Sequence, residues 1–324
     1  MADDFAQALF PRSAVVFNDR MRSNARQYLH SAIGAIEQRI CQIAERDLGV
    51  SHEMVAKIGG GGEPQSFALL EHSGLLKTTD IVGHLFVRAQ HGELAARMLQ
   101  KISQEELELT LTRHLDHDDP DVAEAAMGLL VAQSRTTGTT GELVASLADL
   151  PPEIVYALAW PVTAALASRA GISGPNLQQA AERLLAEHDE SGGVARKAER
   201  LAQLLDASGV KADPFPHPMR DGLALFIARL ARQSGLASEQ IIGFTAEPDM
   251  ARLVVVMRAA DFPVQEALSV FAALDGGDNI LTAATYGETD RDRSLALVSA
   301  WAAPQAYQTA ERLLADDYGG DRQK

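Results

Sequence analysis

Apolar side chains recur every three to four residues along almost the whole chain, and this spacing is the feature that most constrains its fold. Such a period places the apolar side chains on one face of an α-helix, whereas a half-buried strand requires strict alternation of apolar and polar residues. The sequence contains no convincing alternating run. It therefore predicts an all-α protein.

The composition agrees with helices. Alanine and leucine dominate, and aromatic residues make up only 5% of the chain. Alanine and unbranched side chains lose little conformational entropy in a helix. Hydrophobic residues account for 46% of the 324 residues, which is enough for a packed core. A chain of this length is expected to form about two domains.

The first helix is predicted to begin after Ser13, a residue type that caps helices, and to run to about Asp47. Its apolar residues follow a heptad spacing for only about two heptads, so we expect a core helix, with a dimer interface as the alternative. These residues are Leu29, Ile33, Ile36, Ile40 and Ile43. Further helices are predicted near 64–72, 79–91, 93–101, 104–115, 120–134, 140–148, 152–170, 175–187, 192–207, 219–234, 238–246, 248–260, 263–274, 277–287, 290–302 and 304–317.

Two breaks divide the chain. Four consecutive glycines at 59–62 cannot stay helical, and they lack the ending of a phosphate-binding loop. Pro214, Pro216 and Pro218 hold the backbone extended. The predicted division is a long N-terminal helix with its glycine break at 1–62, a helical-repeat domain at 63–212 and a second helical subdomain at 213–324.

The formal net charge of −15 excludes several classes of function. A strongly acidic surface repels both the phosphates of nucleic acid and anionic lipid. Cys41 is the single cysteine, so an internal disulfide is excluded, and no signal peptide is recognised at the N-terminus. The longest uncharged apolar stretch, at 154–168, is shorter than the ~20 residues of a bilayer span and contains Pro161. We expect a buried, kinked helix there and a cytoplasmic protein.

The stretch "HLDHDDPDVAEAAMGLL" at 114–130 is typical of a turn between two helices. Asp119 is predicted at the N-cap, Pro120 at the first helical position, where its missing N–H costs nothing, and Asp121 near the positive end of the helix dipole. A second acidic residue followed by "PD" occurs at 247–249. This copy keeps the acidic residue and the proline but has no histidine.

A metal site is the alternative interpretation of the same stretch. His117-Asp118 resembles the "HD" doublet of the HD-type phosphohydrolases, which are all-helical metalloenzymes. The sequence then departs from that family, because it continues "DPDV" where those enzymes have small, apolar and basic residues. We therefore expect a turn. No catalytic, metal-ligating or cofactor-binding residue is predicted, and no cofactor.

Helix pairs joined by an acidic-proline turn are similar to HEAT-like α-solenoid repeats. The whole chain also resembles the alphaproteobacterial DUF2336 family, a domain of unknown function. The residues that carry this resemblance are the early helix "FNDRMRSNARQYL", the glycine break, the segment "LLKTTDIVGHLFVRAQHGELAARM" and the turn "DDPDVA". The resemblance implies a HEAT-like fold and a bacterial, cytoplasmic setting, and it supplies no catalytic residues.

The leading hypothesis for function is a non-catalytic protein–protein interaction module, such as a regulatory or signalling adaptor. It would bind a partner helix or peptide on its helical surface, and its acidity favours partners with Lys or Arg clusters. Arg20, Arg22 and Arg26 form a basic patch that is the candidate contact, with a solvated face as the alternative.

Three other functions stay open at this point. The first is a metal-dependent HD-like phosphohydrolase that uses His117 and Asp118. The second is a helical-repeat DNA glycosylase, which the charge disfavours. The third is a protein that forms homodimers through the N-terminal helix.

Overall fold

A computed structural model describes residues 19–51, 64–103, 106, 109–110, 112–136, 144–170, 174–208, 214–245, 247, 249–274, 283–304, 307 and 310. Within these residues the protein forms 14 α-helices and two short 3-10 helices, and no strand. The all-α prediction is confirmed. Among the described helices, none combines the length and the hydrophobicity that crossing a bilayer requires.

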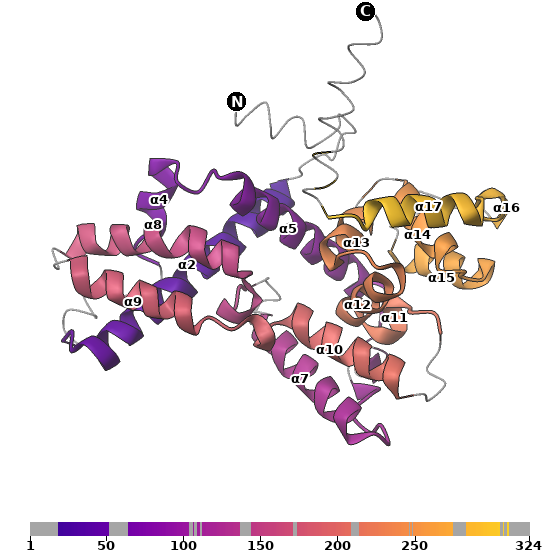
Figure 1. The fold of residues 1–324 in the computed structure, drawn as a ribbon, viewed down its shortest axis with the longest axis horizontal. Coiled ribbons are helices and arrows are strands. Elements are labelled where there is room, and N and C mark those ends of the chain that lie inside the picture. The colour runs from indigo at the N-terminus through magenta and orange to yellow at the C-terminus, as the bar shows by residue number, and fades with distance from the viewer. Residues whose placement is uncertain are drawn as a thin grey trace, which may run out of the picture.

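The first lobe is built around α2 (Asp19–Leu48), which packs against α4 (Phe67–Ser73), α8 (Pro152–Ala170) and α9 (Gly174–Glu187) (Figure 1). Helix α8 has the predicted bounds and continues through Pro161. The heptad-spaced side chains of α2 are all buried in this core. The core-helix prediction is therefore confirmed. A homodimer through α2 stays a prediction, and it would have to use other residues of the helix.

Helix α5 (Thr79–Leu99) leaves the first lobe and enters the second (Figure 1). Ile81, near its start, is buried in the core of the first lobe, whereas Leu94 and Met98 are buried in the core of the second. The prediction of two helices, at 79–91 and 93–101, is wrong, because the helix continues through Gly92. An interior glycine costs only about 1 kcal/mol in a helix, and burial at both ends outweighs that cost.

The second lobe contains the seven helices that follow the proline-rich segment. They are α11 (Pro218–Asp221), α12 (Leu223–Ser234), α13 (Ser238–Thr245), α14 (Ala251–Ala259), α15 (Val264–Leu274), α16 (Ala283–Glu288) and α17 (Arg291–Trp301). Helix α12 is buried on two faces. Phe226 and Leu230 enter the core of the second lobe, and Leu225 and Ala228 pack on the other side. This double burial explains why α12 carries apolar residues nearly all round.

A third, smaller core joins α7 (Pro120–Thr136) and α10 (Val194–Ala207) to the second face of α12. Between α7 and α10 in sequence, the chain returns to the first lobe to form the 3-10 helix η1 (Leu147–Asp149), α8, α9 and the 3-10 helix η2 (Glu190–Gly192). Helices that pack together, such as α2 with α9 and α7 with α10, are thus distant in sequence. A solenoid places neighbouring repeats in contact, so these packings do not confirm a HEAT-like stack.

The turn predicted at 114–130 is confirmed. Residues 113–116 form a turn, and α7 begins at Pro120. The Asp119 carboxylate accepts a hydrogen bond from the backbone N–H of Asp121 at 2.9 Å, which is the geometry of an N-cap. The His117 ring accepts a hydrogen bond from the backbone N–H of Asp119 at 3.1 Å and thereby belongs to the same turn.

The second acidic-proline sequence behaves differently. Helix α14 begins at Ala251, whereas the sequence predicts a start near 248, because Met250 has a left-handed backbone with φ of 46°. The carboxylate of Asp249 accepts from the N–H of Ala251 at 3.1 Å, and that of Glu247 accepts from the N–H of Arg252 at 3.3 Å. Acidic residues cap the helix here too, but in another register; Pro248 lies outside the described residues.

Two other predicted helices need correction. The helix at 219–234 is interrupted at Gly222, whose φ of 76° allows the chain to turn between α11 and α12. A buried salt bridge of 2.9 Å between Asp221 and Arg229 spans this break. In the predicted helix at 140–148, residues 144–146 are not helical and η1 follows them.

The predicted division at 62 and 212 stays a prediction. The three cores group the helices so that the N-terminal helix shares a core with α8 and α9. The predictions for Ser13, the glycine run at 59–62 and the tail after 310 lie outside the described residues.

The turn interpretation predicts unequal effects of two adjacent aspartates. We expect Asp119→Ala to lower the free energy of unfolding by about 1 kcal/mol, because it removes the cap of α7. Asp118→Ala, at an exposed position, should change it by less than about 0.5 kcal/mol. Urea denaturation monitored by circular dichroism measures both. Equal losses in the two variants would contradict the cap.

Candidate functional site

A cleft of about 1060 Å³ lies between the two lobes, and we call it the inter-lobe cleft. Its walls come from α5, from residues 148–153 with η2 and α10, and from α12 and α13. Small side chains line much of it, among them Ala148, Ala195, Ala228 and Ala231. The cleft exists because α5 and α10 join the lobes while the cores remain separate (Figure 1).

His84 and Arg88 of α5 line one end of the cleft, and the buried Tyr28 of α2 lies against them. The Tyr28 hydroxyl lies 3.4 Å from Nε2 of His84, and the Arg88 guanidinium lies over the Tyr28 ring, 5.3 Å from its centroid. Burial lowers the pKa of His84 to about 4, and the Arg88 charge acts in the same direction. Burial also raises the pKa of Tyr28. Both side chains are therefore neutral near pH 7, and Arg88 carries the positive charge.

Asp149 fixes the start of α10. Its carboxylate accepts a hydrogen bond from the backbone N–H of Val194 at 2.7 Å. Burial raises the pKa of Asp149, while this hydrogen bond and the charges of Arg88 and Arg135 act in the opposite direction. Gly193 precedes the helix where η1 and η2 meet, and a Cβ there would overlap the carbonyl oxygen of Ala148. Only glycine allows the two segments to approach this closely.

The charges of the cleft walls are partly cancelled by salt bridges. Arg196 pairs with Glu190 at 2.6 Å and with Glu199 at 2.9 Å, and these hydrogen-bonded carboxylates raise the pKa of Arg196. Arg232 pairs with Asp206. Two exposed carboxylates that line the cleft, Glu153 on α8 and Glu239 on α13, form no ion pair with any described residue.

The side chains of the cleft determine which ligands it can contact. Within the part of the chain that the structure describes, no group of three His, Cys, Asp or Glu side chains converges to hold a metal ion. At the end of the cleft the Tyr28 hydroxyl and the His84 ring contact each other, and the rim carries carboxylates and small apolar side chains. Such a surface can bind the positive charges of a ligand and the apolar side of a peptide.

The predicted basic patch on α2 is largely paired within the chain. Arg26 makes two hydrogen bonds of 3.0 Å to Glu71 and lies over the Phe67 ring. Arg20 lies 3.3 Å from Glu93. Arg22 also interacts within the chain. The structure therefore brings Arg20 and Arg26 to the carboxylates of α5 and α4; the role of the patch in partner binding stays a prediction.

His117 and Asp118, the residues of the metal interpretation, lie in the turn before α7. His117 accepts a backbone N–H, and Asp118 is exposed. His114 lies close enough to Asp221 for that charge to affect its pKa, but burial is the larger effect and lowers the pKa. The single cysteine, Cys41, is buried, and its pKa is raised to about 11.

Sequence reasoning missed the inter-lobe cleft. The side chains at its end and rim come from segments that are far apart in the chain, such as those of His84 and Glu239. Periodicity shows which face of each helix is apolar, but it does not show which helices leave space between them. The nearest signal of the cleft in the sequence was the pair of glycines at 192–193. They indicate a break between helices, but the sequence does not show which segment packs against this break.

No protein family, curated protein or solved structure matches this chain in the comparisons.

The close approach at Gly193 predicts a local effect. We expect Gly193→Ala to lower the free energy of unfolding by about 2–3 kcal/mol, because its methyl group would overlap the Ala148 carbonyl. Gly192→Ala is the matched control, since a Cβ there would lie 3.4 Å from the Cβ of Ala148 and should cost less than about 1 kcal/mol. Thermal and urea denaturation measure both variants. Similar stabilities of the two would contradict the contact.

The low pKa of His84 predicts a loss of stability in acid. As the pH falls from about 6.5 to about 4, the unfolded chain binds a proton at this residue and the folded protein does not, so unfolding is favoured. His84 alone should lower the free energy of unfolding by up to about 3 kcal/mol over this range. His84→Gln should therefore have a flatter pH dependence than the wild type. Parallel curves from urea denaturation would contradict a neutral ring in the folded protein.

Proposed function

We propose that this protein is a non-catalytic interaction module that binds a basic, amphipathic segment of a partner protein in the inter-lobe cleft. The single observation that carries the proposal is the pair of exposed carboxylates, Glu153 and Glu239, which line the cleft from different lobes without an ion-pair partner among the described residues. A segment lying between them would place Lys or Arg side chains toward both walls. The long-range field of a chain with net charge −15 would attract the same partner.

The charge of the cleft supports this choice. Arg232 is neutralised by Asp206, and Arg88 interacts with the partly buried Asp149, so these arginines add little positive charge. Arg196 shares two carboxylates, which leaves that cluster negative. Arg200 is an exposed cation on the α10 wall, and the two rim glutamates outweigh it.

The dimensions of the cleft also support a peptide. Its volume of about 1060 Å³ exceeds the roughly 300–1,000 Å³ typical of small-molecule pockets. The alanines of α10 and α12 leave room for apolar side chains, and Leu236 and Ile242 provide apolar contact. A helix that places apolar residues at i, i+3 and i+4 would present one face to these walls and its lysines to the rim.

The cellular setting and the adaptor role also belong to this proposal. A helical scaffold in the bacterial cytoplasm, as the resemblance to the DUF2336 family implies, is a reasonable setting for a regulatory or signalling adaptor of this kind. The HEAT-like repeat is not required, because the cleft depends on α5 and on the separate cores. No observation in the described residues favours the phosphohydrolase that uses His117 and Asp118.

The proposal predicts charge-selective binding. The probe is a fluorescein-labelled amphipathic peptide of leucine, alanine and lysine. It is compared with a control peptide in which glutamate replaces every lysine. Fluorescence anisotropy should show saturable binding of the lysine peptide alone. The double variant Glu153→Lys/Glu239→Lys should weaken it by at least about tenfold, because both rim contacts become repulsive.

Two controls separate the cleft from the general charge of the surface. Glu182→Lys changes an exposed glutamate of α9 outside the cleft and should alter the affinity by less than about twofold. Ala195→Trp would fill the cleft and should reduce binding, whereas Ala186→Trp, on the exposed side of α9, should not. Equal binding of the two peptides, or equal effects of Glu182→Lys and the double variant, would disprove the proposal.

A further inference from the structure

The solvent-exposed face of α8 carries an aromatic strip that begins at the inter-lobe cleft. Glu153 lines the cleft, and Tyr156 and Trp160 follow it at spacings of three and four residues, so all three lie on one side of the helix. Tyr156 is 62% exposed, and Trp160 is partly exposed. At about 1.5 Å per residue, these residues extend over about 10 Å from the rim of the cleft. We call Glu153, Tyr156 and Trp160 the α8 strip.

Several aromatic rings of this protein are paired with an arginine of the same chain. Among the described residues, the guanidinium lies 4.6–5.8 Å from the ring centroid in Arg26 with Phe67, Arg88 with Tyr28, Arg252 with Phe244 and Arg258 with Tyr286. Within the same part of the chain, neither Tyr156 nor Trp160 has an arginine over its ring, a contact with another ring or a side-chain hydrogen bond. Both rings of the α8 strip are therefore open to a cation from another molecule.

The charge of the α8 strip favours a cation. Glu153 is exposed and forms no ion pair with a described residue. Helix α8 has no other charged side chain before Arg169, which donates a hydrogen bond of 2.8 Å to the backbone carbonyl of Gln65. Residues three apart on a helix have Cβ atoms about 5–6 Å apart. One guanidinium can therefore reach both the Glu153 carboxylate and the Tyr156 ring.

Arginine suits these two groups better than lysine. Its planar guanidinium can donate two hydrogen bonds to a carboxylate while its face lies on an aromatic ring. A lysine ammonium is a strongly hydrated point charge without such a face. Trp160 lies about one turn beyond Tyr156, so it would contact an apolar side chain about one turn from the arginine of a bound helix.

We propose that the α8 strip recognises an arginine of the partner segment that occupies the inter-lobe cleft. This inference rests on the proposed function and specifies the partner further. The Glu153 carboxylate binds the guanidinium, the Tyr156 ring lies against its face, and Trp160 covers an apolar residue of the same segment. The partner therefore carries an arginine, rather than any cation, where it leaves the cleft along α8.

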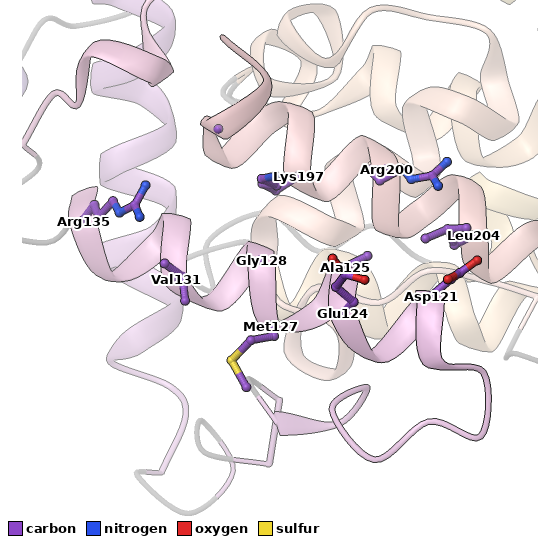
Figure 2. Close-up of a pocket in the computed structure, with 11 residues that line it drawn as sticks. Asp121, Glu124, Ala125, Met127, Gly128, Val131, Arg135, Lys197, Arg200 and Leu204 are labelled. Atoms are coloured by element: carbon purple, nitrogen blue, oxygen red, sulfur yellow. The ribbon is translucent and has the colours of Figure 1, made fainter. Parts of the chain in front are cut away.

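The α7 face provides a control surface outside the α8 strip. A groove of about 670 Å³ lies between α7 and α10 (Figure 2). Its lining includes charges of both signs, from Asp121, Glu124, Arg135 and Lys197. A surface of mixed sign gives no comparable preference for a cation. Met127 of α7 is 49% exposed, so its removal changes an exposed apolar side chain at a distance from α8.

The test compares two peptides of equal charge, the leucine–alanine–lysine probe and the same peptide with arginine at every lysine position. Fluorescence anisotropy should show about three- to fivefold tighter binding of the arginine peptide to the wild type. Tyr156→Ala should remove this preference, whereas Tyr156→Phe should keep it because the ring remains. Tyr307→Ala, at a tyrosine that is 59% exposed, and Met127→Ala should also keep it.

Tryptophan fluorescence tests the contact directly. Trp160 and Trp301 are the two tryptophans of the chain, and the Trp301 ring packs against Phe244. In the variant Trp301→Phe, the unlabelled arginine peptide should shift the emission of Trp160 to shorter wavelength, with the same concentration dependence as the anisotropy. Emission that stays unchanged at saturating peptide would overturn the proposed contact.

The outcomes separate this proposal from the proposed function. Equal affinity for the two peptides, or a preference that survives Tyr156→Ala, would overturn arginine recognition and leave charge-selective binding in the cleft intact. Failure of both peptides to bind would overturn both proposals. A second copy of the chain is the competing occupant of the α8 strip. Self-association in sedimentation velocity that Tyr156→Ala abolishes, without an arginine preference, would favour that copy and overturn the proposal.

Discussion

Burial of the two ends of α5 in different cores is the constraint on which the arrangement depends. Ile81 is held in the first lobe and Leu94 in the second, and the helix between them is continuous. At about 1.5 Å per residue, its 21 residues extend over about 30 Å. The lobes are therefore held apart by a rigid element. The space between them becomes a cleft with fixed walls, because α10 and α12 complete the connection on the other side.

The carboxylates of this acidic chain fall into two groups. Some carboxylates neutralise arginines on neighbouring helices, as Glu71 does for Arg26 and Glu190 for Arg196. Others remain exposed without partners among the described residues, and these determine what each surface can bind. Glu153 and Glu239 make the cleft selective for basic ligands in our proposal.

Local features of the fold could be predicted from the sequence, but the packing of distant helices could not. Proline and capping residues indicated the start of α7, and the predicted bounds of α8 were correct. Gly222 and Met250 were missed as helix breaks because a positive φ leaves little trace in the apolar period. The candidate site was missed because the apolar period shows which face of each helix is buried. It does not show which other helix packs against that face. For the same reason, the basic patch on α2 was recognised but its pairing with α4 and α5 was not.

The most direct test of this account measures the distance between the lobes in solution. Spin labels at Glu182→Cys on α9 and Gln265→Cys on α15 would report it by double electron–electron resonance. Cys41 can stay in place, because its thiol is buried and its pKa is raised to about 11. A rigid α5 predicts one narrow distance distribution. A broad distribution, as expected for two lobes on a flexible connection, would contradict the claim that α5 fixes the cleft.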